Sequence, residues 1–190
     1  MVSRIHILGA PGSGVTSLGQ ALAGQLQFPF FDTDNYYWFT DDVLPFRRKR
    51  NPQHRLQVMS AELEQAPQFV LSGAVLGWGE IWCPRFEAVV YRWLPAELRR
   101  ERIWQRECGR YGQERVSPGG DLHLVYEKFV EWASHYDRPS DNRRSRQAEL
   151  AWLDTLHCPV LRLEEDLPLP LLLEQTLAFL SKTSSRRPIY

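Results

Sequence analysis

Short runs of apolar residues recur along the chain, and each is followed by a segment whose apolar residues have helical spacing. Such runs are typical of strands that are buried in a parallel sheet. They predict strands over residues 4–8, 28–31, 69–71, 88–94 and 159–163. Because strand and helix alternate along the whole chain, the pattern predicts a three-layer α/β fold with a parallel five-stranded sheet.

The first predicted strand leads into a glycine-rich loop. Residues 9–16 read Gly-Ala-Pro-Gly-Ser-Gly-Val-Thr, which follows the phosphate-binding pattern G-x-x-x-x-G-K-S/T everywhere except at Val15. Glycines let backbone N–H groups turn inward around a phosphate, and the following helix N-terminus adds the positive end of its dipole. The predicted nucleotide-binding residues are Gly9, Gly12, Ser13, Gly14, Val15, Thr16 and Ser17.

Val15 stands where the pattern calls for lysine. That lysine neutralises charge between the β- and γ-phosphates of a nucleotide, which a valine side chain cannot do. The hydroxyl of Thr16, by contrast, is the group that binds Mg²⁺ in this pattern. The loop therefore indicates nucleotide binding more directly than phosphoryl transfer.

Two segments do not fit the alternation of strands and helices and read as inserted lobes. The first, residues 35–66, holds an aromatic run, a basic run and a helix with Asn51 as its N-cap and Pro52 as its first residue. The second, residues 108–121, is rich in glycine and arginine. That composition favours a mobile lid that closes over an anion, and an amphipathic helix follows it.

The composition indicates which partners and which cellular compartment to expect. The 190 residues include 23 Lys and Arg and 23 Asp and Glu, and this balance does not indicate nucleic acid or a membrane surface as a partner. No apolar stretch approaches the roughly 18 residues of a membrane span. The first predicted strand begins too early for a cleavable leader, and three scattered cysteines are typical of reduced thiols. We expect a cytoplasmic protein with one domain over residues 1–181 and a flexible tail over 182–190.

The order of these features resembles the nucleoside-monophosphate-kinase-like family, which includes adenylate, shikimate and gluconate kinases. Residues 8–14 look like an adenylate kinase loop, and Phe-Asp-Thr-Asp at 31–34 looks like the D-x-D of shikimate and gluconate kinases. The match is tight over residues 5–34 and otherwise one of layout. The resemblance implies a P-loop NTPase fold with an acceptor-binding insertion at 35–66 and a lid at 108–121.

Two aspartates at the end of the second strand are candidates for further chemistry. Residues two apart on a strand share a face, so Asp32 and Asp34 are expected to project to the same side, where two carboxylates favour a cation. A polar turn or a helix cap is the alternative. The resemblance implies that Asp32 serves Mg²⁺ together with Thr16, and that Asp34 holds the acceptor hydroxyl. We also expect Gly73 at the acceptor, although Ser72 stands where adenylate kinases carry an aspartate.

Basic residues of the insertions are candidates for binding anions. Arg47 lies where shikimate kinase has an arginine for its acid substrate, although residues 48–50 are also basic and a solvated surface is the alternative. Arg110 and Arg115 in the lid would supply positive charge to the γ-phosphate as it transfers. In adenylate kinases, arginines that follow the lid helix reach the phosphates, and Arg143 is our choice among several there.

The missing loop lysine leaves two functions open. In the first, the chain is a kinase that uses ATP or GTP with Mg²⁺ to phosphorylate a hydroxyl or phosphate of a small molecule, while a lid arginine or Lys49 supplies the lost charge. In the second, it is a catalytically weak nucleotide-binding module that reports nucleotide occupancy through lid closure. The retained aspartates and lid arginines favour the kinase. Sulfotransferase loops also lack this lysine, but the glycine pattern and the short chain argue against that class.

Overall fold

Across the described part of the chain, five parallel strands form one sheet with the order β2-β3-β1-β4-β5. The structure is a computed structural model, and it describes residues 2–41, 46, 48–138 and 144–185. The strands are β1 (Arg4–Gly9), β2 (Phe30–Asp32), β3 (Phe69–Ser72), β4 (Ala88–Arg92) and β5 (Val160–Leu163). The five predicted strands are present. β2 begins later than expected, because Phe28 still closes the turn after the preceding helix (Phe28 N to Ala23 O, 3.0 Å), and β4 ends at Arg92 rather than at residue 94.

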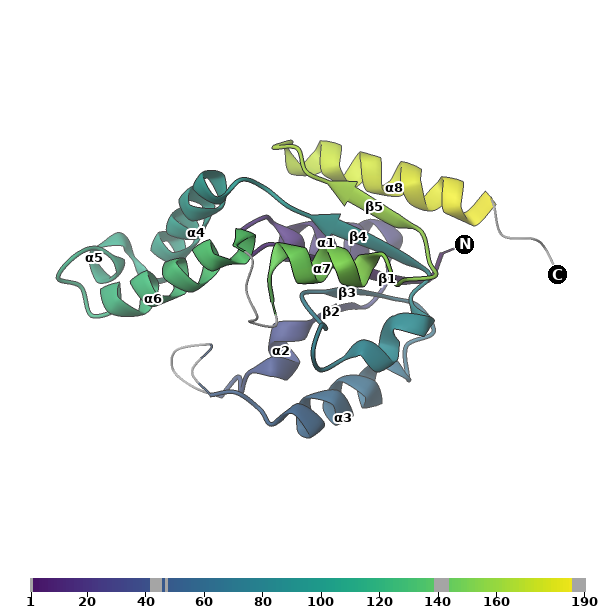
Figure 1. The fold of residues 1–190 in the computed structure, drawn as a ribbon, viewed down its shortest axis with the longest axis horizontal. Coiled ribbons are helices and arrows are strands. Elements are labelled where there is room, and N and C mark those ends of the chain that lie inside the picture. Colours follow the sequence, from purple (N-terminus) through teal and green to yellow (C-terminus); the bar gives the residue numbers. More distant parts are fainter. Residues whose placement is uncertain (1, 42–45, 47, 139–143, 186–190) are drawn as a thin grey trace.

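Helices cover both faces of the sheet, which confirms the predicted three-layer α/β fold (Figure 1). Helices α1 and α8 lie on one face, and α3, α7 and the 3₁₀ helix η1 lie on the other. The helical elements are α1 (Val15–Leu26), α2 (Thr33–Tyr37), α3 (Pro52–Leu63), η1 (Glu80–Arg85), α4 (Ala96–Tyr111), α5 (Gln113–Val116), α6 (His123–Ser134), η2 (His135–Asp137), α7 (Arg146–Leu153) and α8 (Leu169–Ser185).

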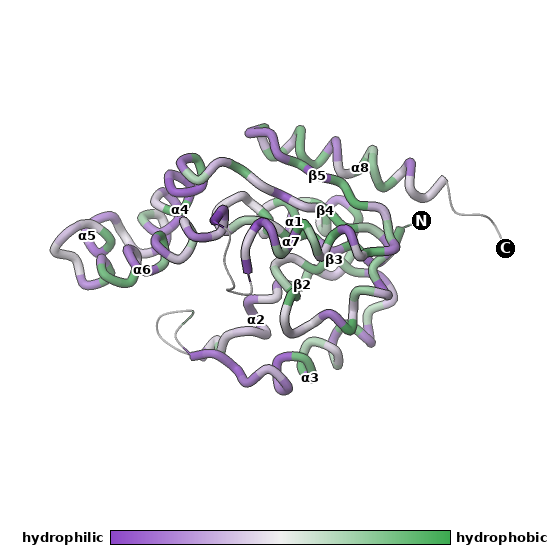
Figure 2. Tube along the Cα trace, in the orientation of Figure 1, coloured by the Kyte–Doolittle hydropathy of each residue, from purple (hydrophilic) through white to green (hydrophobic). Residues whose placement is uncertain are grey.

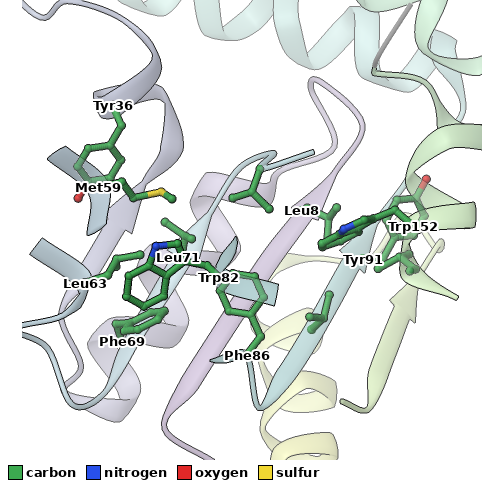
Figure 3. Packing of buried hydrophobic residues seen from close by; sticks show 13 residues of the cluster. Leu8, Tyr36, Met59, Leu63, Phe69, Leu71, Trp82, Phe86, Tyr91 and Trp152 are labelled. Atoms are coloured by element: carbon green, nitrogen blue, oxygen red, sulfur yellow. The ribbon is translucent and has the colours of Figure 1, made fainter. Parts of the chain in front are cut away.

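Two hydrophobic clusters fill the space between the sheet and its helices. Side chains alternate along a strand, so Ile5 and Ile7 of β1 face α1 and α8 whereas Leu8 faces the opposite cluster. That opposite cluster is aromatic, and Phe69, Trp82 and other rings pack edge to face in it (Figure 3). Hydrophobic segments coincide with the strands and inner helices, whereas α4 is largely hydrophilic (Figure 2).

Two helix boundaries bear on the predictions. The Asn51 side chain accepts a hydrogen bond from His54 N (3.0 Å), and Pro52 opens α3, as expected for an N-cap followed by proline. At the other end of the chain, α8 continues to Ser185, so residues 182–185 of the predicted tail are helical. The rest of that tail lies outside the described residues.

Helices α4, α5 and α6 form an arm that projects from the sheet (Figure 1). In the predicted lid, residues 108–121, α4 continues through Tyr111 and α5 follows after Gly112. The Trp104 and Tyr126 rings pack edge to face 5.2 Å apart and join α4 to α6. The predicted lid is therefore largely a paired-helix structure.

Candidate functional site

The loop at residues 9–14 lies tightly against the end of β4. Gly9 has a φ of 150°, and a Cβ atom there would lie 1.8 Å from the carbonyl oxygen of Arg92. Only a residue without a side chain allows this approach. The same Arg92 carbonyl accepts hydrogen bonds from Ala10 N (3.0 Å) and the Ser13 hydroxyl (3.0 Å). The loop is thus anchored by its own residues to the edge of the sheet where the strands end.

The open side of this loop fits an anion. Gly14, with a φ of 94°, is the N-cap of α1 and offers no side-chain cap, so the first N–H groups of α1 have no capping partner. Together with the helix dipole they make a phosphate-binding environment. Val15 is half-buried and packs against the cluster beneath α1 and α8. Its hydrocarbon side chain supplies no charge at the position where the pattern has lysine.

Thr16 and Asp32 lie side by side, as the resemblance implies. The Thr16 hydroxyl donates to one carboxylate oxygen of Asp32 (3.0 Å), and the other oxygen accepts from Asp34 N (3.0 Å). A hydroxyl and a carboxylate are hard oxygen ligands, and Mg²⁺ takes one or two of these from a protein while keeping waters and phosphate oxygens. These two side chains therefore fit Mg²⁺ bound with a nucleotide.

Asp34 does not continue the strand. The expectation that Asp32 and Asp34 share a strand face is wrong, because β2 ends at Asp32 and Asp34 lies in the first turn of α2. Asp32 caps α2 through its side chain, which was the alternative left open. The two carboxylates are still neighbours, since they are joined through the Asp34 N–H.

The Asp34 carboxyl has an unusual environment. The side chain is exposed to solvent, and Asp32, Trp38, Arg106 and Arg144 lie near enough to influence it. Desolvation raises the pKa of Asp34 above its usual value, and the charge of Asp32 raises it further. Arg144, Arg106 and a hydrogen bond with Trp38 oppose the increase. A carboxyl with a raised pKa is a stronger base than an ordinary aspartate.

Cations stacked on aromatic rings line the acceptor lobe, residues 35–66. The guanidinium of Arg55, a buried residue of α3, lies 3.6 Å from the Tyr37 ring centre, and its Nε donates to Arg50 O (2.6 Å). The Lys49 ammonium lies 5.5 Å from the Trp38 ring centre. Stacking leaves the edge of a guanidinium able to donate to an anion. Arg47, the predicted anion-binding residue, lies outside the described residues.

Gly73, just after β3, lies against the first residue of α2. Its N–H donates to Ile7 O (2.9 Å), and a Cβ atom at this position would lie 1.9 Å from the Thr33 hydroxyl oxygen. The glycine thus lets α2 approach the sheet and sets the position of Asp34. Ser72 donates to Val15 O (3.4 Å), which ties the end of β3 to α1.

The predicted lid arginines are not brought to the phosphate loop. Arg115 forms two hydrogen bonds with Asp121 (2.9 and 2.6 Å) in the outer part of the arm, away from α1 (Figure 1). Arg110 lies 5.9 Å from the Phe46 ring centre of the acceptor lobe and 3.9 Å from a Glu107 oxygen. The expected delivery of charge from these two residues is therefore not seen, because helices hold them at the arm.

Other arginines reach the loop instead. Arg144 donates to Gly9 O (2.9 Å), Arg99 to Pro11 O (3.2 Å) and Arg102 to Ser13 O (3.4 Å). In the sequence, Arg99 and Arg102 are indistinguishable from a salt-bridged helix face, and Arg144 is one of several arginines after α6. No spacing singles them out. Arg143, our choice there, lies outside the described residues.

Two cavities lie apart from the phosphate loop, Thr16, Asp32 and Asp34. One, of about 530 Å³, opens beside β2, α2 and α3, and its lining includes Asn35, Arg50 and Glu62. The other, of about 410 Å³, lies at the connection between β5 and α8. Within the described ranges, no group of three or more His, Cys, Asp or Glu residues could hold a metal ion, and no helix has the length and apolar character to cross a bilayer.

The loop, the sheet order and the helical layers define a P-loop NTPase fold of the shikimate-kinase kind. The chain is similar to shikimate kinase from Acinetobacter baumannii (TM-score 0.56, 17% identity, 98% of this chain and 97% of that one). It is also similar to shikimate kinase from Bacteroides thetaiotaomicron (TM-score 0.55, 15% identity, 95% and 99% covered). At such identities the likeness concerns the fold alone.

The sequence itself has a nearer relative. The chain is 40% identical over 181 residues to the uncharacterized protein YqaC of Bacillus subtilis (strain 168), which covers 95% of this chain and 99% of that protein. The chain belongs to the family of that protein. No protein-family model matches the sequence.

Proposed function

We propose that the protein is an ATP-dependent kinase that phosphorylates a hydroxyl or phosphate group of a small metabolite or nucleotide. The observation that carries this proposal is the continuous set of contacts from the loop to Asp34. Thr16 bonds Asp32, and Asp32 bonds the N–H of Asp34, each at 3.0 Å. A nucleotide site, a candidate Mg²⁺ ligand pair and a candidate base thus follow one another along one edge of the sheet.

Each residue has a distinct part in the proposed reaction. The loop N–H groups bind the β-phosphate, and Thr16 with Asp32 would hold Mg²⁺, which when bound neutralises charge on the phosphates. Asp34 accepts the proton of the acceptor hydroxyl while that oxygen forms a bond to the γ-phosphorus and the bond to the leaving ADP oxygen breaks. Arg55 would bind an anionic group of the acceptor.

A catalytically weak nucleotide-binding module is the second candidate. Val15 favours it, because losing one preorganised cation costs roughly a hundred- to thousandfold in rate. The backbone N–H groups would still bind a phosphate. The two candidates differ in turnover and agree in nucleotide affinity.

Calorimetric titration with ATP and GTP, with and without Mg²⁺, tests the part common to both candidates. We expect binding that improves with Mg²⁺ and is abolished by Gly14→Val, which places a side chain on the phosphate side of the loop. ADP release is then followed over a panel of sugar acids, hydroxylated acids and nucleoside monophosphates. For the kinase, Asp34→Asn lowers turnover roughly 10²- to 10⁴-fold and spares ATP affinity.

Glu174→Gln, at an exposed position on the outer helix α8, is the matched control for a lost carboxylate and should behave like the parent. A parent that binds ATP and turns over no acceptor leaves the binding module as the function. A parent that binds neither ATP nor GTP at millimolar concentration contradicts both candidates.

A further inference from the structure

Alternate carbonyl groups of the phosphate loop are each bonded by a different arginine. The carbonyls of residues 9, 11 and 13 accept from Arg144 (2.9 Å), Arg99 (3.2 Å) and Arg102 (3.4 Å). One of the two intervening carbonyls, that of residue 10, accepts from the Ser13 hydroxyl (2.7 Å). The N–H groups of Ala10 and Ser13 bond Arg92 O (3.0 Å) and Ala10 O (3.1 Å), so a phosphate would be met by the N–H groups of Gly12, Gly14 and the first turn of α1.

Each of these arginines is itself fixed by a carboxylate behind it. Arg99 is 1% exposed, bonds Asp137 and also donates to Leu94 O (2.9 Å) and Ala133 O (3.1 Å). Arg144 bonds the fully buried Glu149 (3.2 Å), and Arg102 bonds Asp166. The guanidinium groups are thus held in one geometry before any ligand arrives.

A fourth arginine lies beside the loop. Arg92 ends β4, is fully buried, and among the described residues bonds only carbonyls, those of Leu163 (2.9 Å) and Trp93 (3.2 Å). Two of its guanidinium nitrogens have no hydrogen-bond partner in this part of the chain. Arg92 therefore adds a buried positive charge that no carboxylate of the described residues bonds.

We infer that Arg99, Arg102 and Arg144 form a scaffold on the carbonyl side of the loop that takes over the orienting and charge-neutralising work of the missing lysine. Arg102 is the member nearest the open side, because its Nη1 lies 3.6 Å from the Cβ position of Gly14 and its side chain is 36% exposed. The ligand it serves is a polyphosphate. The inference rests on the proposed nucleotide binding.

A double-mutant cycle between the missing lysine and Arg102 tests the scaffold. The affinities of ATP with Mg²⁺ and of inorganic tripolyphosphate are measured for the parent, Arg102→Met, Val15→Lys and the double variant. We expect Arg102→Met to weaken binding about 10- to 100-fold, the size of a lost hydrogen bond to a charged group. Val15→Lys should change the parent by less than about threefold and restore most of the loss in the Arg102→Met background.

Arg100→Met is the matched control, because Arg100 is an exposed arginine of the same helix. It should bind like the parent. Equal effects of Val15→Lys in both backgrounds would mean that lysine and Arg102 act independently, and would overturn the inference. So would an Arg102→Met variant with the affinity of the parent.

A ligand-free measurement separates this inference from the proposed function. Amide hydrogen exchange over residues 10–14 should be faster in Arg99→Lys and in Arg102→Met than in Arg100→Met, because the loop loses a bonded carbonyl. If the parent fails to bind nucleotide, the proposed function falls. If loop exchange is also unchanged in both variants, the scaffold falls by its own test.

Discussion

Charged and titratable side chains occupy the interior of this protein at positions close to its candidate site. Arg92, Arg99 and Glu149 are each 1% exposed or less. Arg99 and Glu149 have charged partners, as buried charges require, whereas the hydrogen bonds of Arg92 within the described residues go to backbone carbonyls. Burying such groups is costly, and removing the partner of a buried charge is strongly destabilising.

His6 gives a prediction for acid stability. It is buried in β1, bonds Leu71 O (3.1 Å) and stacks on Phe86, and burial lowers its pKa to about 4. Because the unfolded chain binds a proton near pH 6.5, the stability present above that pH is lost as the pH falls toward 4. The loss attributable to His6 between pH 7 and pH 5 is about 2 kcal/mol.

Denaturant unfolding at the two pH values measures this term. His6→Gln should have a smaller difference in unfolding free energy between pH 7 and pH 5 than the parent, whatever its absolute stability. The exposed His157 supplies the control, and His157→Gln should keep the difference of the parent. A His6→Gln variant with the pH dependence of the parent contradicts the assignment.

For Asp34 we predict the opposite dependence of stability on pH. Its folded pKa is raised, so its contribution to stability is present below the usual aspartate value of about 3.9 and is lost as the pH rises through the folded pKa. At pH 7 the ionised carboxylate therefore destabilises the fold. Asp34→Asn should raise the melting temperature at pH 7 and lose that advantage at pH 3.5. An equal or lower melting temperature at pH 7 contradicts this view of Asp34.

At the scale of elements, the junction between β3 and α2 sets the acceptor side of the site. Strand β2 lasts only three residues before Asp32 caps α2, and Gly73 at the end of β3 allows α2 to lie against the sheet. Close approach of two backbones is a common reason for glycine at such a place. The helix that carries Asp34 is thereby positioned by a neighbouring strand rather than by its own five residues.

Gly73→Ala tests this junction. The residue has a φ of 101°, and the added methyl group would meet the Thr33 hydroxyl, so we expect a loss of about 1–3 kcal/mol in unfolding free energy. Turnover should fall more than ATP affinity, because α2 moves and the loop does not. The control is Gly24→Ala in α1, where nothing lies within 4 Å of the Cβ position, and it should stabilise by up to about 1 kcal/mol. Equal losses of turnover and ATP affinity in Gly73→Ala would contradict the view that this junction positions α2 and not the loop.

At the scale of the whole molecule, one sheet joins both hydrophobic clusters and the site. Strand β1 contributes Ile5 and Ile7 to one cluster and Leu8 to the other, and then leads directly into the loop. The acceptor lobe and the arm lie at the same edge of the sheet, where parallel strands end and where ligands bind in α/β folds (Figure 1). Ligand binding at that edge is therefore coupled to the stability of the fold.

The coupling has an expected size. A ligand that binds only the folded state at 100 times its Kd stabilises by about 2.7 kcal/mol. For a chain of 190 residues this corresponds to a rise of about 5–10 °C in melting temperature. ATP with Mg²⁺ should produce it, and EDTA or Thr16→Ala should reduce it. A shift that is unaffected by both would place the Mg²⁺ ligands elsewhere.

Structural features that depend on residues close together in the chain were predictable from the sequence. Buried strands, the glycine loop and the N-cap of α3 follow from patterns a few residues long, and the structure has all of them, with shifted bounds at β2 and β4. The resemblance to the kinase family implied that Thr16 and Asp32 act together, and their side chains are hydrogen-bonded at 3.0 Å. Local patterns thus sufficed for the fold and for the nucleotide side of the candidate site.

Which arginines contact the loop depends on the packing of segments that are distant in sequence. Arg99, Arg102 and Arg144 contact the loop across as many as 135 positions of sequence, and these contacts exist only once the segments that carry them pack together. Conversely, Arg115 lies in a promising segment but is held at the arm by Asp121. An arginine has the same local signature on a solvated face and in a buried cluster, because partners distant in sequence, and not neighbours, determine its environment.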